Sequence, residues 1–472
     1  MFINRCLKGL FDVAGMKSYI FRFFLFFSLS SLLVCDLGCS KKENGQGTPQ
    51  DSVSSDLPFA EVPDISDITM YEINERAFSI PGNFSGILFR LDSIRSLGVN
   101  VIWLMPVYPI GIIKTVNSPY CVRNYQEVNP EFGTLEDLRT LVREAHKRKM
   151  AVILDWVANH TSWDNPWIQN KSWYTQDGNG NIVHPPGTNW EDVADLNFDN
   201  KEMRLEMINS MKYWLLRANI DGFRCDAADF VPFSFWKQAI DSLKHLSDRK
   251  IILLAEGARR DHFEAGFQMN FGWDFFNKNK NVFKNNQYAS GYYQTHLSEY
   301  SSIPGGSHKL RFTSNHDECA WDNTPLGLFG GKAASMAAFV ISSYMGGVPL
   351  IYNGQEVGCP VKLPFFSRLP IDWSTNPEMC KEYRWLMGLR ATHPALRRGG
   401  LEYYPDNNIV AFKRFLKDDE VVIIINTRNS GNTFNIPENL QRTDWKNAFN
   451  GENVVLGSQR SLNAFEYLIL IK

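Results

Sequence analysis

Arg224 and Asp226 lie two residues apart at the end of an apolar run that begins at Ile220. If this run is a β-strand, successive side chains point to opposite faces, so Arg224 and Asp226 share one face while Cys225 lies on the other. A neighbouring guanidinium lowers the pKa of an aspartate and keeps it ionised, which suits a nucleophile. The pair therefore predicts a nucleophilic carboxylate. The alternative is a structural salt bridge at a strand end.

Two further acids occupy similar places in the sequence. The apolar run 250–255 is typical of a buried parallel strand and is followed at once by Glu256, whose carboxyl group we expect to be poorly solvated. The run 309–314 predicts another strand and leads to His316 and Asp317. Three carboxylates at the C-terminal ends of predicted strands favour a catalytic site over unrelated salt bridges.

These residues resemble the signature motifs of the alpha-amylase family, glycoside hydrolase family thirteen. Six stretches match the family's motifs in order and spacing between about Ile68 and Leu396, namely 155–160, 194–197, Arg224 with Asp226, Glu256, His316 with Asp317, and 347–356. The resemblance implies a (β/α)8 TIM barrel with a short inserted domain after the third strand and a C-terminal antiparallel β domain.

The apolar pattern also predicts a barrel on its own. Short apolar runs alternate with helical patterns, as in the repeated βα units of a parallel sheet. The predicted strands are 69–73, 99–106, 150–154, 220–225, 251–255, 267–271, 310–314 and 349–352, and Thr134 is expected to cap a helix over 135–149. Eight such units fit a closed barrel, whose chemistry lies at the C-terminal strand ends. The alternative is an open doubly wound sheet, but the sequence lacks its Gly-rich phosphate turn.

Composition divides the chain into four parts. They are a signal peptide with a lipoprotein cleavage site at 1–39, a flexible tether at 40–65, a catalytic barrel at 66–396 with an inserted domain at 161–198, and a C-terminal β-sandwich domain at 397–472. The inserted stretch intersperses Trp163, Trp167, Trp173 and Trp190 with Asn, Gly and Pro. A long loop within a barrel is usually functional, so these rings either stack on sugars or form a small core of their own.

The N-terminal segment has the features of an export signal. Lys17 and Arg22 precede the apolar run 23–34, which is too short to span a membrane as a mature helix. The run leads to Cys39, in a pattern that resembles a bacterial lipoprotein cleavage site with Cys39 as the lipidated residue, and Cys35 is a second candidate. We expect a membrane-anchored bacterial lipoprotein, periplasmic or at the cell surface. The alternative is an uncleaved anchor.

The family resemblance implies retaining hydrolysis of α-glucosidic bonds in starch-like polysaccharides or maltooligosaccharides by double displacement. Asp226 would be the nucleophile. Glu256, with a pKa raised by desolvation, would be the general acid and then the base. Asp317 would stabilise charge on the sugar ring.

Four more residues are expected to bind substrate. Tyr120 matches the family's stacking tyrosine, His160 and His316 would donate hydrogen bonds to hydroxyls of the same sugar, and Arg224 would hold the nucleophile. An α-glucan transglycosylase or an oligosaccharide-trimming α-glucosidase would use the same covalent intermediate. A non-catalytic glucan-binding lipoprotein or a transporter-associated subunit would not need three acids.

We expect no cofactor to be required. Asn159 and Asp195 match two of the family's calcium ligands, but Asp229 and Phe230 stand where calcium-binding relatives often have Lys and His. With 472 residues, 44% of them hydrophobic, and a net charge of −2, the chain can bury a large core and has no basic excess for nucleic acid. The cysteines that follow Cys39 are odd in number and show no disulfide framework, being Cys121, Cys225, Cys319, Cys359 and Cys380.

Overall fold

The computed structural model describes residues 57–246, 249–301 and 303–472. The predicted signal peptide, Cys39 and most of the predicted tether lie outside these residues. Within the described ranges no helix is both long enough and apolar enough to cross a membrane.

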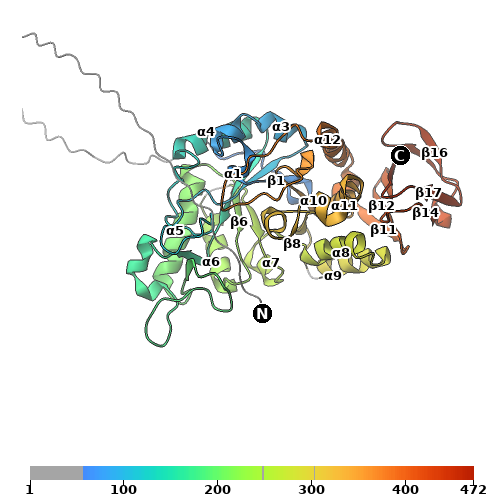
Figure 1. Ribbon diagram of the computed structural model, residues 1–472. Coiled ribbons are helices and arrows are strands. Elements are labelled where there is room, and N and C mark those ends of the chain that lie inside the picture. Colours follow the sequence, from blue (N-terminus) through green and yellow to red (C-terminus); the bar gives the residue numbers. More distant parts are fainter. Residues whose placement is uncertain (1–56, 247–248, 302) are drawn as a thin grey trace, which may run out of the picture. The chain divides into compact units, whose positions relative to one another are not determined.

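Eight parallel strands close into a barrel (Figure 1). They follow one another around the barrel in the order β1 (Met70–Ile73), β10 (Val348–Tyr352), β9 (His308–Arg311), β8 (Met269–Phe271), β7 (Ile252–Ala255), β6 (Gly222–Cys225), β3 (Ala151–Trp156) and β2 (Val101–Leu104). This confirms the predicted (β/α)8 barrel.

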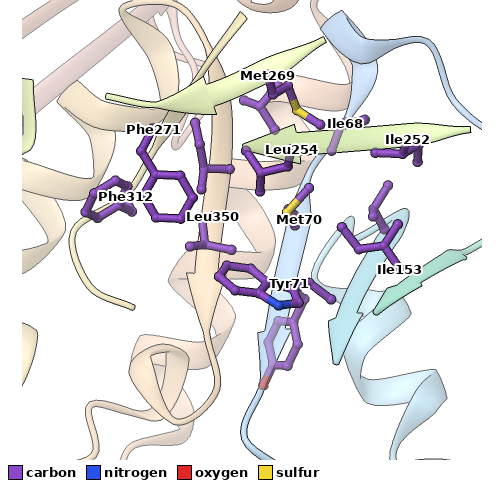
Figure 2. Packing of buried hydrophobic residues seen from close by; sticks show 14 of the residues in the cluster. Ile68, Met70, Tyr71, Ile153, Ile252, Leu254, Met269, Phe271, Phe312 and Leu350 are labelled. Atoms are coloured by element: carbon purple, nitrogen blue, oxygen red, sulfur yellow. The ribbon is translucent and has the colours of Figure 1, made fainter. Parts of the chain in front are cut away.

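The barrel interior is a packed apolar core. Figure 2 shows Met70, Ile153, Leu254, Met269 and Leu350, which belong to five different strands, gathered in one cluster. All five side chains are buried. Because strands of a parallel barrel are covered on both faces, they form continuous apolar runs, and this is why the sequence shows them clearly.

Helices connect the strands. They are α1 (Glu75–Phe78), α2 (Phe84–Leu88), α3 (Leu91–Ser96), α4 (Leu135–Lys147), α5 (Lys201–Arg217), α6 (Phe233–Lys244), α7 (Asp261–Ala265), α8 (Trp273–Lys284), α9 (Tyr292–Tyr300), α10 (Pro325–Phe329), α11 (Lys332–Tyr344), α12 (Pro377–Thr392) and α13 (Pro394–Arg398). The predicted cap of α4 is confirmed, because the Thr134 side chain accepts a hydrogen bond from the Asp137 N–H and the Asp137 carboxylate accepts one from the Thr134 N–H.

The seventh strand differs from the prediction of 310–314. β9 begins at His308 and ends at Arg311, so Asp317 does not directly follow a strand. The ladder between β9 and β10 contains only the pairs Leu310 with Val348 and Arg311 with Pro349. Proline has no N–H to donate to a ladder, which explains why the pairing stops there.

The inserted segment after β3 is small. β4 (His160–Ser162) pairs with β5 (Val193–Asp195), and two short helical turns, η2 (Pro166–Gln169) and η3 (Lys171–Trp173), lie between them. The ring of Trp167 contacts those of Trp173 and Tyr125, so these tryptophans pack within the protein. Trp190 instead lines a pocket, and stacking of its ring on a sugar stays a prediction.

The C-terminal part is antiparallel, as predicted. A six-stranded sheet runs in the order β11 (Gly400–Tyr404), β12 (Ile409–Leu416), β13 (Asp419–Asn426), β18 (Tyr467–Ile471), β15 (Asp444–Asn447) and β16 (Asn453–Val455), and β14 (Asn432–Asn435) pairs with β17 (Gln459–Leu462). Phe434 and Leu462 of the smaller sheet share a core with Ile424 and Leu470 of the larger one.

Candidate active site

The three predicted catalytic acids lie at one end of the barrel and line one pocket. Asp226 follows β6 directly, Glu256 follows β7 directly, and Asp317 lies in the segment after β9. The pocket has a volume of about 540 Å³ and is lined by Val116, Ser118, Tyr120, His160, Asn189, Trp190, Asp192, Val193, Asp226, Ala227, Glu256, His316, Asp317, Trp321, Phe365 and Phe366. The structure thus brings every predicted catalytic residue together, and Tyr120, His160 and His316 with them.

Arg224 lies beneath the acids and contacts two of them. Its fully buried guanidinium is 2.9 Å from Asp226 Oδ1 and 2.7 Å from Glu256 Oε2. It is also 2.7 Å from Asp155 Oδ1, which is fully buried as well. One cation therefore links the proposed nucleophile, the proposed acid and a structural carboxylate.

Glycine at position 222 allows β6 to approach β7 closely. Gly222 has a φ of +152°, and a Cβ atom there would lie 1.9 Å from the Ile252 carbonyl oxygen. Only glycine fits this position without moving a strand. The close approach brings Asp226 and Glu256, which directly follow these two strands, into the same site.

The pKa of Asp226 shifts in the opposite direction to the one predicted from the sequence. Burial raises the pKa of Asp226 to about 6, although Arg224 opposes this rise. The expected lowering of its pKa is therefore wrong. The main physical reason is burial, and the negative charges of Asp155 and Asp317 near the same carboxylate raise the pKa further. Arg224 also contacts Asp155 and Glu256, so its charge does not act on Asp226 alone.

Glu256 behaves as predicted. Burial raises the pKa of Glu256 to about 7, with Arg224 again opposing. Its Oε2 accepts a hydrogen bond from the Ala227 N–H at 2.7 Å, which fixes the carboxyl group beside the nucleophile. A carboxyl group with this pKa holds its proton in about half of the molecules at pH 7 and can donate it.

His316 is held between charged and polar partners. Its Nδ1 is 2.5 Å from Glu72 Oε1 and its Nε2 is 2.7 Å from the Tyr120 hydroxyl. Burial alone would lower the pKa of His316, but Asp317 and Glu72 raise it to about 9. The imidazolium can therefore donate both N–H groups, and the Tyr120 hydroxyl can pass its own hydrogen bond to Asp155 Oδ2 at 3.1 Å.

His160 lies on another wall and is neutral. Burial lowers the pKa of His160 to about 4, and its Nδ1 lies 3.3 Å from Asn159 Nδ2. An amide N–H donates, so Nδ1 accepts and Nε2 carries the proton. A hydrogen bond between the ring and the main chain of Tyr120 works against this lowering of the pKa. The ring also contacts Trp190, whose indole in turn contacts Phe230.

Sequence reasoning missed three members of the site. Glu72 balances His316, the Trp103 indole N–H donates to Asp155 Oδ2 at 3.1 Å, and Trp321 lies at the rim of the pocket. Glu72 could have been found from the sequence, because it is a charged residue within the otherwise apolar run of β1. Trp103 and Trp321 carry no such signal, because an aromatic residue in a strand or a loop is usually packing.

Asn159 and Asp195, the two residues that match calcium ligands of the family, lie next to one strand pair, because Asn159 directly precedes β4 and Asp195 ends β5. No group of three or more His, Cys, Asp or Glu side chains that could hold a metal ion occurs within the part of the chain that the structure describes. The Asn159 amide donates to His160, and burial raises the pKa of Asp195. The Asn159 side chain is therefore used within the protein.

Comparison with known proteins places the chain in a family. Residues 42–181 and 187–385 match the family model for the alpha amylase catalytic domain. Alpha-amylase 2 of Dictyoglomus thermophilum is 29% identical over 381 residues, covering 75% of this chain and 66% of that protein. This chain thus spans slightly less than two thirds of that relative.

Similar solved structures are also alpha-amylases. An alpha-amylase from Lactobacillus plantarum superposes with a TM-score of 0.79 at 25% identity, covering 86% of this chain and 99% of that one. A maltogenic alpha-amylase from Thermotoga neapolitana gives 0.77 at 26% identity, covering 87% and 99%. The chain therefore belongs to the alpha-amylase family of glycoside hydrolases.

Proposed function

We propose that this protein hydrolyses α-glucosidic bonds in starch-like polysaccharides or maltooligosaccharides with net retention at the anomeric carbon. The observation that carries the proposal is the convergence of Asp226, Glu256 and Asp317 on one pocket, with Arg224 in contact with the first two. Glycosidases use two carboxyl groups of this kind, one as nucleophile or base and one as general acid. In the retaining class the two groups lie about 5 to 5.5 Å apart.

In the first step, Asp226 attacks the anomeric carbon while the bond from this carbon to the leaving oxygen breaks. Glu256 gives its proton to that oxygen, so the leaving sugar departs as an alcohol and Asp226 carries a glycosyl ester. In the second step, the Glu256 carboxylate takes a proton from water, whose oxygen attacks the anomeric carbon and releases Asp226. Asp317 binds hydroxyls of the same ring, whereas both N–H groups of His316 already face Glu72 and Tyr120, so His316 acts by holding Tyr120 in place.

The pattern of products tests this proposal. The purified protein is incubated with starch, pullulan, cyclodextrin and short maltooligosaccharides, and products are separated by chromatography. Proton NMR at early times is expected to show the α-anomer before mutarotation. Initial β-anomer would contradict the mechanism. Products longer than the substrate would indicate transfer of the glycosyl group to a sugar, and absence of cleavage would favour a glucan-binding protein.

We also propose that Cys39 is lipidated and anchors the mature protein to a bacterial membrane. Support comes from the apolar run 23–34 and the residues around Cys39, all outside the described structure. Cys39→Ser is expected to release the protein from the membrane fraction or to stall its processing. If Cys35→Ser has this effect and Cys39→Ser does not, the assignment of the cysteine is wrong.

Finally, we propose that activity requires no calcium ion. The proposal is supported by the contact of the Phe230 ring with Trp190, at the position where calcium-binding relatives use a histidine carbonyl. Thermal unfolding and activity after exhaustive chelation test this proposal.

A further inference from the structure

Asp317 is the most exposed of the three acids. Its side chain is 39% exposed, against 12% for Asp226 and 17% for Glu256. Neither Arg224 nor a main-chain N–H is found among the described hydrogen-bond donors to its carboxylate. An exposed carboxylate without fixed partners samples several rotamers, and this would be costly for a group that must meet a transition state.

One side chain supplies a partner. The Trp321 indole N–H donates to Asp317 Oδ1 at 3.2 Å, while the other carboxylate oxygen lies 3.4 Å from His316 Nε2. Each oxygen of Asp317 thus faces one nitrogen on a ring. Since a carboxylate oxygen accepts more than one hydrogen bond, both oxygens still have capacity for sugar hydroxyls.

The chain holds Trp321 in this position. Trp321 belongs to a π-helical turn, η5 (Glu318–Asp322), that starts directly after Asp317. The two acidic ends of this turn, Glu318 and Asp322, contact the Lys280 ammonium at 3.8 and 2.8 Å. π-Helical turns are uncommon and often lie at functional sites.

The ring itself is placed as a wall of the pocket. Its plane meets Phe365 and Phe366 edge-on at centroid distances of 5.6 Å each, and Phe365 is buried against His316. Trp321 nevertheless remains 64% exposed. A large aromatic side chain that stays mostly exposed while lining a pocket beside three acids is unusual for a purely structural residue.

We propose that Trp321 is a positioning residue that fixes the Asp317 carboxylate toward the sugar ring and forms the wall beside it. The inference rests on the proposed glycosidase function. Trp321 acts on the reaction through Asp317, so loss of its N–H reduces turnover more than substrate binding. The predicted ligand on this wall is the α-linked glucose ring whose bond is cleaved.

Trp321→Phe tests the positioning role, because it keeps an aromatic ring against Phe365 and removes only the donor. With a chromogenic maltotrioside, kcat is expected to fall about tenfold while KM changes by less than about twofold. The reason is that the lost hydrogen bond is made to a charged group and stabilises mainly the transition state. Trp321→Ala is expected to raise KM as well. The thermal midpoint of either variant stays near that of the wild type, since the side chain is mostly exposed.

Trp373→Phe is a matched control. Its indole also donates one hydrogen bond, to the Phe78 carbonyl at 2.9 Å, but it does not line the pocket. This variant is expected to keep the wild-type kcat. If Trp321→Phe also keeps it, the proposed role of Trp321 is wrong.

A double-mutant cycle separates positioning from a general structural role. With maltotriosyl fluoride, whose good leaving group keeps slow variants measurable, Asp317→Asn with Trp321→Phe is expected to be no slower than Asp317→Asn alone. A further tenfold loss would show that Trp321 does not act through Asp317. If the wild-type protein cleaves no α-glucoside at all, the proposed function is wrong. If the wild type is active and Trp321→Phe is equally active, only the role of Trp321 is wrong.

Discussion

Arg224 is shared among three carboxylates, and this sharing decides how the site titrates. The fully buried Asp155 competes for the same guanidinium as Asp226 and Glu256. One positive charge cannot hold three buried carboxyl groups fully ionised, so burial prevails and their pKa values rise. The enzyme thereby obtains an acid and a nucleophile from two chemically similar groups.

Replacing any of the three acids is expected to abolish most of the activity. Asp226→Asn, Glu256→Gln and Asp317→Asn should each lower kcat by about a thousandfold or more, and their effects should not add, because all three act in one transition state. Steady-state rates with a chromogenic maltooligosaccharide measure the loss, and far-ultraviolet circular dichroism checks the fold. A variant that keeps more than about a tenth of the wild-type rate would remove that residue from the catalytic set.

The dependence of kcat/KM on pH follows from the two raised pKa values. Activity requires ionised Asp226, whose pKa is about 6, and protonated Glu256, whose pKa is about 7. The rate is therefore expected to fall as the pH drops below about 6 and as it rises above about 7, giving a narrow bell. Because the groups interact, the two limbs report the pair. A rate that keeps rising above pH 8 would contradict Glu256 as the acid.

At this scale the sequence predicts the residues but not their surroundings. Asp226 and Glu256 stand out because each follows an apolar strand. The contacts of Glu72 with His316 join residues 244 positions apart, and no local pattern contains them. For the same reason the net direction of the Asp226 pKa depends on Asp155 and on burial, which only the folded barrel brings together.

At the scale of elements, strands buried on both sides were predictable and polar edge strands were not. β7 and β10 are continuous apolar runs and lie close to their predicted positions. β15 and β17 have the sequences DWKN and QRSL, and each carries only one buried residue. Such strands are defined by their pairing partners rather than by their own apolar pattern.

The capping box of α4 allows an element-scale prediction. Thr134→Ala removes the side chain that accepts from the Asp137 N–H, and it is expected to lower the free energy of unfolding by about 1 kcal/mol. Urea unfolding followed by circular dichroism measures this change.

Thr140→Ala serves as the control, because Thr140 lies inside the same helix and caps nothing. It is expected to be neutral or slightly stabilising, since alanine has the higher helix propensity. Equal losses for both variants would contradict the assigned cap. Activity should be unchanged in both, because neither residue lines the pocket.

At the scale of the whole molecule, main-chain hydrogen bonds join the inserted segment to the barrel, and they do not depend on a bound metal ion. The Leu196 N–H donates to the Asn159 carbonyl at 3.1 Å, and the Ser162 N–H donates to the Val122 carbonyl at 2.9 Å. Within the segment itself, the hydroxyl groups of Thr161 and Tyr174, both of which are fully buried, are 2.9 Å apart. These contacts can hold the segment in place in the absence of a cation.

Removal of calcium is therefore expected to leave the thermal midpoint and the activity unchanged. Exhaustive chelation is followed by calorimetry and by rate measurements, with calcium and magnesium added back separately. A midpoint that falls by more than a few degrees, and that calcium but not magnesium restores, would show that the ion is structural.

The crowding of acids around Arg224 has a consequence for ligand binding. Among the residues that the structure describes, two cationic groups, Arg224 and His316, pair with the five acids Glu72, Asp155, Asp226, Glu256 and Asp317. A neutral glucan that fills the pocket displaces water from these carboxyl groups, and desolvation raises their pKa values further. Sugar binding near neutral pH should then draw protons from the solution. The heat of binding would depend on the ionisation enthalpy of the buffer, although the ligand itself carries no charge.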